Sequence, residues 1–352
     1  MKGVVLAGGT VSRLRPITFS RAKHLVPVAN RPILFYGLED LAEAGIRDVG
    51  IVISPQTGDE IQAAVGTGEE LGINPTFIVQ DRPLGLAHAL ATALPFVDGD
   101  DCLMYLGDNI VKDGVADVVA DFRKHRPNCQ ILLSPVPNPE AFGVADMAED
   151  GSIRRLVEKP TVPPSDLALV GVYLFDAGIA EAVASISPSS RGELEITDAI
   201  QWLIDHDRAV RASIVRDWWK DTGTKDDLLH AQELVIGGMA SRIDGEVIDS
   251  RMRGAVAVGA GSRIVDCDIT GPAVIGEGVS MARTAIGPQT SIGHGCRVTD
   301  AAVESSIVMD QSEIHGWRLR DSLLGRGTRL HGTPPPSFVE MTLGERCEII
   351  GE

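Results

Sequence analysis

Aliphatic residues recur every six residues in the last third of the chain, interleaved with glycine-rich stretches such as IGEGV and IGHGC. The spacing is kept by Ile286, Ile292 and Val298, and by the pairs Val258–Ile264 and Ile269–Ile275. Such a repeat is typical of a parallel β-helix, in which aliphatic side chains fill a prism and glycines permit tight corners. The alternative is a looser all-β domain with chance glycines, since the register weakens between residues 299 and 323. We predict a hexapeptide-repeat β-helix domain over residues 237–352. A connecting helix in TKDDLLHAQELVIGGM should precede it and end at Gly237–Gly238.

The first 236 residues follow a different pattern, in which short apolar runs alternate with amphipathic stretches. The expected strands are KGVVLA, DVGIVIS, TFIVQ, DCLMYLGD and QILLSPV, and the expected helices are RPILFYGLEDLAEAG, DEIQAAVG, GLAHALATALPF and GVADVVADFRKH. This alternation predicts an α/β domain with a mainly parallel sheet over residues 1–236. Because ligands of such sheets bind at the carboxyl ends of the strands, we expect the site in the loops that follow them.

Composition excludes several classes of protein. The 352 residues carry a formal net charge of -17, with 32 Lys and Arg against 49 Asp and Glu, so we expect no nucleic-acid partner. The five cysteines are widely spaced and include no C-x-x-C pair, which favours reduced thiols over a disulfide framework or a zinc knuckle. The sequence shows no charged-then-apolar leader and no run of about 18 apolar residues. We therefore expect a soluble, unprocessed cytoplasmic protein with no membrane partner.

The segment LAGGTVSRLRPIT follows the first expected strand and has the parts of a phosphate-binding loop. Gly8 and Gly9 can turn the chain so that successive N–H groups face one point. Arg13 and Arg15 offer fork-shaped donors that match phosphate oxygens, and Lys23 follows before a second turn. The segment is neither a Walker A loop nor a G-x-G-x-x-G dinucleotide loop. The alternative interpretation is a surface turn with solvated arginines.

The same segment resembles the opening of the sugar-1-phosphate nucleotidyltransferase family, L-A-G-G-x-G-[TS]-R-L-x-P-x-T followed after four residues by K-x-L-x-P-V. The matching positions are Leu6, Ala7, Gly8, Gly9, Ser12, Arg13, Leu14, Pro16, Thr18, Lys23, Leu25, Pro27 and Val28. One position departs, because Val11 stands where the family has glycine. Within the family, the chain is most similar to glucose-1-phosphate thymidylyltransferases of the long form. The resemblance implies a Rossmann-like nucleotidyltransferase domain with a mixed sheet and a C-terminal left-handed β-helix.

The stretch QDRPLGLAHAL resembles the family's base-recognition loop, Q-x-x-P-x-G-L-A. The Gln80 amide offers a donor and an acceptor, so it can pair with the N3–H and a carbonyl of thymine or uracil but fits guanine poorly. Gly85 would let its backbone approach the base. The resemblance also assigns Leu6, Gly8 and Gly9 to nucleotide binding. The alternative for Gln80 is a polar residue at a helix start.

Two acids are implied as ligands of Mg²⁺. Asp108, in MYLGDN, matches the metal-binding aspartate of the family's L-G-D-N, and Asp221, in DWWKDTG, matches that of W-x-D-T-G. Carboxylates from distant segments that meet at one cation form a typical metal site for nucleotide phosphates. Taken alone, Asp108–Asn109 would be an ordinary turn.

The sugar-phosphate side of the site is implied by four further matches. The family's F/Y-G-V and E-K-P motifs place Gly143 and Glu158 at sugar hydroxyls and Lys159 at the sugar phosphate. LVGVYLFD resembles the sugar-pocket strand, with Leu169 and Gly171 as its lining. In SSRGELEITDAI, Arg191 would help to hold phosphate and Glu193 would touch or cap the sugar. A solvated Glu–Lys pair is the alternative for E-K-P.

The implied reaction converts dTTP and glucose 1-phosphate into dTDP-glucose and pyrophosphate, for deoxysugar or antibiotic biosynthesis. The sugar phosphate is already anionic, so no side-chain nucleophile is needed, and positioning and charge neutralisation carry the rate. Arg13, Lys23 and Lys159 are the expected catalytic residues.

Alternatives remain on the sequence alone. Val11 could weaken the loop, leaving a protein that only binds sugar nucleotides, and UTP or another sugar or cyclitol phosphate could be the substrate. The β-helix could be an acyltransferase with His294 as base. We also expect a homo-oligomer, formed through the β-helix.

Overall fold

The computed structural model describes residues 1–9, 13–333 and 337–351. Val11 and its neighbour Ser12 lie outside these residues. The chain divides into two compact units, one made of Met1–Gly9 and Leu34–Asp221 and the other of Thr10–Ile33 and Thr222–Glu352. The predicted domain boundary between residues 236 and 237 is not one of these division points and stays a prediction.

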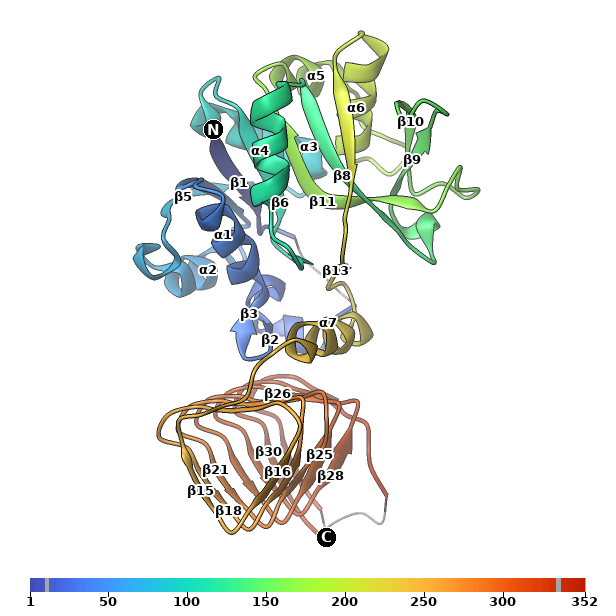
Figure 1. Cartoon of the computed structure of the whole chain (residues 1–352). Helices are drawn as coiled ribbons and strands as arrows, with labels where there is room; N and C mark the ends of the chain where they lie inside the picture. The colour runs from blue at the N-terminus through green and yellow to red at the C-terminus, as the bar shows by residue number, and fades with distance from the viewer. Residues whose placement is uncertain (10–12, 334–336, 352) are drawn as a thin grey trace. The chain divides into compact units, whose positions relative to one another are not determined.

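A mixed nine-stranded sheet forms the centre of the first unit (Figure 1), in the order β10-β9-β11-β6-β1-β4-β5, with β8 beside β11 and β12 beside β8. Its strands are β1 (Lys2–Leu6), β4 (Asp48–Ile53), β5 (Asn74–Val79), β6 (Cys102–Leu106), β8 (Cys129–Pro135), β9 (Gly143–Met147), β10 (Ile153–Glu158), β11 (Leu167–Phe175) and β12 (Val210–Ile214). The neighbours β6, β1, β4 and β5 are parallel, whereas β11 is antiparallel to β6 and β8. The predicted Rossmann-like α/β fold is confirmed.

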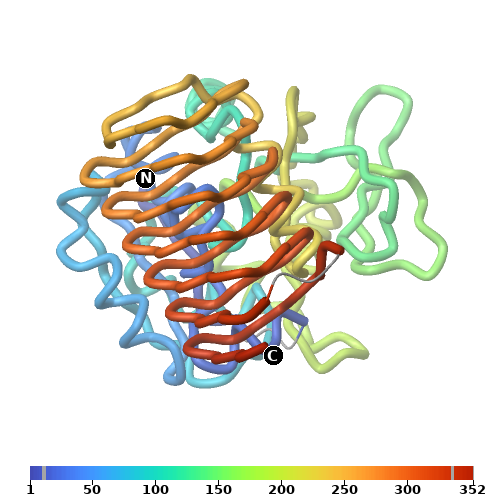
Figure 2. The backbone as a smooth tube through the Cα atoms, turned by 90° about the horizontal axis from the view of Figure 1, so that it is seen from below, coloured from blue at the N-terminus to red at the C-terminus, as the bar shows by residue number. Residues whose placement is uncertain are grey.

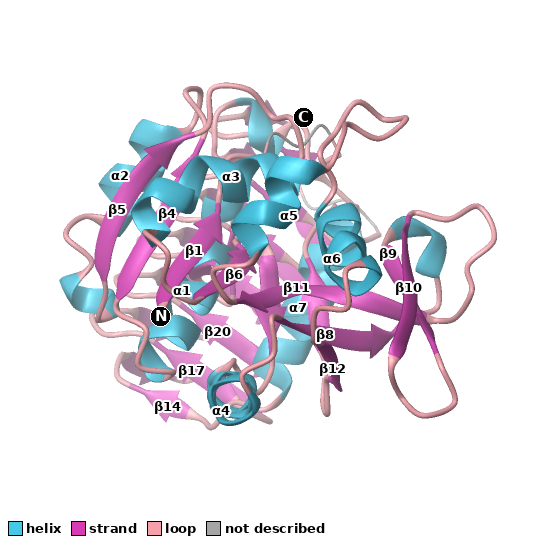
Figure 3. Cartoon of the chain, turned by 90° about the horizontal axis from the view of Figure 1, so that it is seen from above, coloured by secondary structure: helices cyan, strands magenta, loops and turns pink. Residues whose placement is uncertain are grey.

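Helices cover both faces of this sheet, because alternate residues of its strands face opposite sides. The helices are α1 (Ile33–Glu43), α2 (Gly58–Val65), α3 (Leu86–Val97), α4 (Ala116–His125), α5 (Ile179–Ser185) and α6 (Ile196–Asp205). Figure 3 shows α3, α5 and α6 across one face, where Cys129 and Ile131 of β8 join the core. The intervening Gln130 faces the other side and donates a hydrogen bond to Asp121 of α4. The short 3-10 helices η3 (Glu69–Leu71) and η4 (Pro139–Ala141) lie in loops.

The second unit contains the left-handed β-helix, built from three parallel sheets (Figure 2). The first sheet comprises β14 (Arg242–Ile243), β17 (Val256–Val258), β20 (Ala273–Ile275), β23 (Thr290–Ile292), β26 (Ile307–Val308), β29 (Leu323–Leu324) and β31 (Thr342–Leu343). The second comprises β15 (Glu246–Ile248), β18 (Arg263–Val265), β21 (Ser280–Ala282), β24 (Arg297–Thr299), β27 (Glu313–His315), β30 (Arg329–His331) and β32 (Glu348–Ile350). The third comprises β16 (Arg251–Arg253), β19 (Asp268–Thr270), β22 (Ala285–Ile286), β25 (Ala302–Glu304) and β28 (Arg318–Arg320).

The inward-facing positions of the β-helix are fully buried and aliphatic, as predicted, but their spacing is not uniform. Buried inward residues of successive strands are Val258, Ile264, Ile269, Ile275, Met281, Ile286, Ile292, Val298, Val303, Val308, Ile314, Leu319, Leu324 and Leu330. Val258 and Ile264 are six residues apart. Ile264 and Ile269 are only five apart, because the corner after the second sheet is shorter. Asp266, at that corner, has a φ of 51°. Beyond β25 another corner also shortens, which explains the weak register of residues 299–323.

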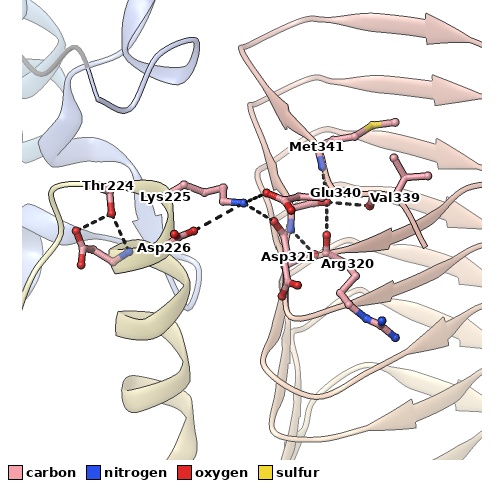
Figure 4. A network of polar contacts seen from close by, with 11 residues as sticks. Thr224, Lys225, Asp226, Arg320, Asp321, Val339, Glu340 and Met341 are labelled. Carbon is pink, nitrogen blue, oxygen red and sulfur yellow. Dashed lines mark hydrogen bonds and ion pairs between the residues drawn. The ribbon is translucent and has the colours of Figure 1, made fainter. Parts of the chain in front are cut away.

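The connecting helix α7 (Lys225–Gly237) begins after Thr224, whose side-chain oxygen accepts a hydrogen bond from the Asp227 N–H at 3.2 Å. It is tied to the β-helix at two places. The buried Gln232 donates to the carbonyl of Ser306 and accepts from Ser291. At the other end, Lys225 donates to the Asp321 carbonyl at 3.0 Å and pairs with Glu340 (Figure 4).

The remaining elements of the second unit are short: η1 (Ile17–Phe19), η2 (Lys23–Leu25), β2 (Pro27–Val28) and β3 (Arg31–Pro32). Arg21 forms an ion pair with Glu345, and Asn30 donates to the Ile292 carbonyl, so this segment packs on the β-helix. Among the helices of the described chain, none is both long and apolar enough to cross a membrane.

Candidate active site

The carboxyl ends of four neighbouring parallel strands meet at one edge of the sheet in the first unit. The Ala7 N–H, just after β1, donates to the Val52 carbonyl of β4 at 2.7 Å, and Gln80, just after β5, donates from its N–H to Ile53 at 2.9 Å. Gly107, just after β6, donates to the carbonyl of Leu6 at 3.0 Å. The loops singled out in the sequence therefore begin side by side, where ligands of such sheets bind.

Gly8 is held against the end of β4 in this cluster. A Cβ at Gly8 would lie 3.3 Å from the carbonyl carbon of Ile53 and 3.6 Å from the Gln80 Oε1, whereas a Cβ at Gly9 would meet nothing within 4 Å. The close approach of backbone and amide gives Gly8 a reason to be glycine. The side chain of Leu6 is buried in the core, so any contact of Leu6 with a nucleotide would use its backbone.

The Gln80 side chain is only 8% exposed, and its Nε2 lies 2.8 Å from the Nδ1 of His88, on α3. Gly85 precedes α3 with a φ of 106°, and a Cβ there would lie 2.4 Å from the carbonyl oxygen of Leu194. Ala87 donates to that same oxygen. Packing against Leu194 thus requires glycine at position 85. The sequence alone explains this glycine only by the approach of its backbone to the base.

The two predicted metal ligands are brought together by a short ladder. Asp108 directly precedes β7 (Asn109–Val111), and Asp221 ends β13 (Trp219–Asp221), where it lies opposite Asn109 in antiparallel register. The described residues contain no group of three or more His, Cys, Asp or Glu side chains able to hold a metal. A nucleotide-bound Mg²⁺ needs only one or two carboxylates, since phosphates and water supply its other ligands. The pair fits a metal that arrives with a nucleotide.

Asn109 organises this ladder, although its sequence context suggested only a turn. Its side chain is 2% exposed. The Oδ1 accepts hydrogen bonds from the Trp219 indole N–H at 2.6 Å and from the Gly171 N–H at 3.2 Å. The Nδ2 donates to the Asp108 carboxylate at 2.8 Å. One buried amide therefore connects β7, β11 and β13 and orients Asp108. A Cβ at Gly171 would lie 2.5 Å from the Asn109 Oδ1, so Gly171 makes room for it.

The predicted sugar residues also meet. Gly143 and Glu158 are paired in the β9–β10 ladder. A Cβ at Gly143 would lie 2.7 Å from the Thr197 methyl carbon, 3.0 Å from the Glu158 carboxylate and 3.7 Å from the Leu169 side chain. The Thr197 hydroxyl donates to Glu158 at 3.2 Å. Thr197 was not singled out in the sequence, although it stands in the quoted E-I-T-D segment.

Charged residues surround the Glu158 carboxylate. Lys159 has a φ of 41°, and its Nζ lies 3.8 Å from the Glu158 carboxylate. Arg191 lies 3.4 Å from Glu158, 3.3 Å from Glu193 and 3.5 Å from the nearly buried Glu195. Burial raises the pKa of the Glu158 carboxyl, while the charge of Lys159 lowers it and that of Glu195 raises it further. The cluster presents cations beside carboxylates, which suits a ligand with phosphate and hydroxyl groups.

Arg13 and Lys23 belong to the second unit, where Arg13 is exposed and Lys23 is 6% exposed. Their predicted place beside a triphosphate stays a prediction. His294 of the β-helix accepts a hydrogen bond at its Nδ1 from the Glu277 N–H at 3.0 Å. This bond links successive coils and supports a structural role for His294 over an acyltransferase base.

The comparisons with known proteins agree with this arrangement. The family model for nucleotidyl transferases matches residues 2–236. The chain belongs to the nucleotidyl transferase family. This nucleotidyl transferase is 48% identical over 349 residues to the glucose-1-phosphate thymidylyltransferase of Streptomyces griseus and 46% identical over 353 residues to that of Streptomyces antibioticus. The first match covers 98% of both chains and the second 99% of both, so the β-helix part is shared.

A solved structure from Bacillus anthracis, named as a glucose-1-phosphate thymidylyltransferase, is also similar to this nucleotidyl transferase. It is 37% identical with a TM-score of 0.63, and the match covers 66% of this chain and 94% of that one. The match supports the Rossmann-like catalytic fold, and the shorter relative spans only about that part of the chain.

Proposed function

We propose that the chain is a glucose-1-phosphate thymidylyltransferase, which makes dTDP-glucose and pyrophosphate from dTTP and glucose 1-phosphate. The full-length match to relatives of that name carries the proposal. The meeting of Asp108 with Asp221, and of Glu158 with Lys159, supports it with a site for a metal-bound nucleotide beside one for a sugar phosphate. Supply of dTDP-glucose to deoxysugar or antibiotic biosynthesis is part of the same proposal.

In this reaction an oxygen of the sugar phosphate attacks the α-phosphorus of dTTP in line, a new P–O bond forms, and the bond to pyrophosphate breaks. A Mg²⁺ held by Asp108 and Asp221 would neutralise charge on the triphosphate. Lys159 binds the sugar phosphate, and Arg13 and Lys23 hold the triphosphate. Gln80 orients the base. Positioning and charge neutralisation carry the rate, because the attacking group is already an anion.

The contacts around Glu158 support the proposal that glucose 1-phosphate is bound there. Glu158, held by Thr197 and Arg191, would accept hydrogen bonds from sugar hydroxyls, and Gly143 leaves the space that such a contact needs. Arg191 is surrounded by three carboxylates, so we propose that its main effect is to hold them in place.

Pyrophosphate release tests the reaction. The full-length protein is incubated with Mg²⁺, glucose 1-phosphate and one nucleoside triphosphate at a time. Release with dTTP, weaker release with UTP, and none with GTP is the expected result. If none of the triphosphates gave pyrophosphate release, the proposed reaction would be rejected. The same series with galactose 1-phosphate tests the choice of sugar.

We also propose a cytoplasmic homo-oligomer. The five cysteines are all free thiols, which supports a reducing compartment. The three flat sheets of the β-helix offer faces and ends for self-association, and light scattering of the full-length protein gives the number of copies.

A further inference from the structure

The contact between Gln80 and His88 fixes the direction of an amide that would otherwise be free to turn. An amide nitrogen only donates hydrogen bonds, so the 2.8 Å contact from Gln80 Nε2 makes the His88 Nδ1 an acceptor. In this tautomer the ring proton lies on Nε2. The nitrogen end of the amide faces His88, and its Oε1 lies over Gly8, where the missing side chain leaves room.

Both partners are held by their backbones. Gln80 is bonded to the end of β4 through its N–H. His88 is the third residue of α3, a helix whose start is fastened by the hydrogen bonds from Leu194 to Leu84 and from Ala87 to Leu194. Thr92, one turn further on, donates to the His88 carbonyl at 2.9 Å. The position of the imidazole therefore depends on a rigid helix start rather than on a mobile loop.

This orientation distinguishes two kinds of pyrimidine. Thymine and uracil present an N3–H donor beside a carbonyl acceptor, and cytosine presents the reverse, an N3 acceptor beside an amino donor. An amide whose oxygen faces N3 accepts a hydrogen bond from the N3–H of thymine. The second N–H of its nitrogen can then donate to the neighbouring carbonyl of the base. Cytosine needs the amide turned by 180°. That turn would bring Oε1 against the Nδ1 lone pair of His88 unless the ring proton also moved.

We propose that His88 is a specificity-determining positioning residue, which selects thymine and uracil over cytosine by holding the Gln80 amide in one orientation. This inference rests on the proposed function, in which Gln80 reads the base. His88 itself need not touch the nucleotide. Its loss should change the ratio of affinities for the two bases, whereas loss of a merely structural residue weakens both affinities alike.

Calorimetry measures the equilibrium binding of dTTP and of dCTP, each with Mg²⁺, to the full-length wild type, to His88→Leu and to the control His125→Leu. We expect the wild type to prefer dTTP. In His88→Leu that preference should fall roughly fivefold to tenfold, the value of one hydrogen bond. His125→Leu, the same change at the exposed last residue of α4, should keep that preference. If the leucine variant does not fold, His88→Phe takes its place. It retains a ring without the nitrogen, and the preference for dTTP should fall by the same factor.

An unchanged ratio in the folded His88 variants, with both affinities altered equally or not at all, would overturn the assignment. The binding readout separates this from the proposed reaction. A wild type that prefers dTTP in binding but releases no pyrophosphate would reject the reaction, and a fall of the preference in His88→Leu would still support the role of His88.

Discussion

Replacing Asn109 by alanine removes the amide that joins three strands at the metal-ligand pair. The Gly171 N–H, which is buried, loses its acceptor, and an unsatisfied buried donor costs about 1–3 kcal/mol. The Trp219 indole is partly exposed, so its N–H can turn to water, and that loss is about 0.5–1.5 kcal/mol. Together these contacts predict that Asn109→Ala lowers the free energy of unfolding by about 3 kcal/mol.

The functional effect follows from the third contact. Without the Nδ2 donor, the Asp108 carboxylate loses the hydrogen bond that orients it. Residues that orient metal ligands typically matter by about 10-fold to 100-fold in metal affinity or activity. We therefore expect the Mg²⁺ concentration for half-maximal pyrophosphate release to rise at least severalfold.

Urea unfolding and a Mg²⁺ titration of activity measure the two effects. Asn74→Ala is the matched control, since Asn74 is exposed and its side chain donates a hydrogen bond to Asp48 at 3.0 Å. It should change the unfolding free energy by less than about 0.5 kcal/mol and leave the titration unchanged. An Asn109→Ala protein as stable as the control would refute the reasoning from the buried amide. A destabilised protein with an unchanged Mg²⁺ titration would refute the link to Asp108.

Three further predictions concern other parts of the chain. Burial raises the pKa of Asp40 to about 7, although its hydrogen bond from Tyr105 lowers the pKa. Between pH 4 and 7 the Asp40 carboxyl therefore keeps its proton in the folded protein, whereas the unfolded chain loses it near pH 4. Stability should fall by about 2–4 kcal/mol as pH rises from 4 to above 7, and urea unfolding of Asp40→Asn should not show that fall. Lys159→Met should raise the KM for glucose 1-phosphate by about 10-fold to 100-fold with little change for dTTP, and equal changes in both would contradict its assignment to the sugar phosphate. Lys225→Met should cost about 1 kcal/mol through its lost bonds to Asp321 and Glu340, and unaltered urea unfolding would show that this contact contributes nothing.

The sequence predicted half of the inward positions of the β-helix, because a buried aliphatic residue at each strand is a condition of the fold. It did not predict that at two kinds of corner, one after the second sheet and one beyond β25, the inward residues are five apart instead of six. The corner after the second sheet has a left-handed backbone at residues such as Asp266, and aspartate there carries no sequence signal as clear as glycine.

The candidate site was predicted in part. Motifs identified Asp108, Asp221 and Glu158, and the ladders bring these residues to the expected neighbours. Asn109 was missed, because an asparagine after an aspartate is an ordinary turn signal until its burial is known. Gly85 was assigned to the base alone, since its contact with Leu194 joins segments far apart in the chain.

The most direct test of the account is pyrophosphate release from dTTP and glucose 1-phosphate in the presence of Mg²⁺, compared between the wild type, Asp108→Asn and Asp221→Asn. We predict turnover by the wild type and a loss of at least 100-fold in each variant at fixed Mg²⁺, if each carboxylate contributes roughly 3 kcal/mol to the metal-bound transition state. Turnover that persists in both variants would contradict the metal site. Absence of turnover in the wild type with every triphosphate would contradict the proposed activity itself.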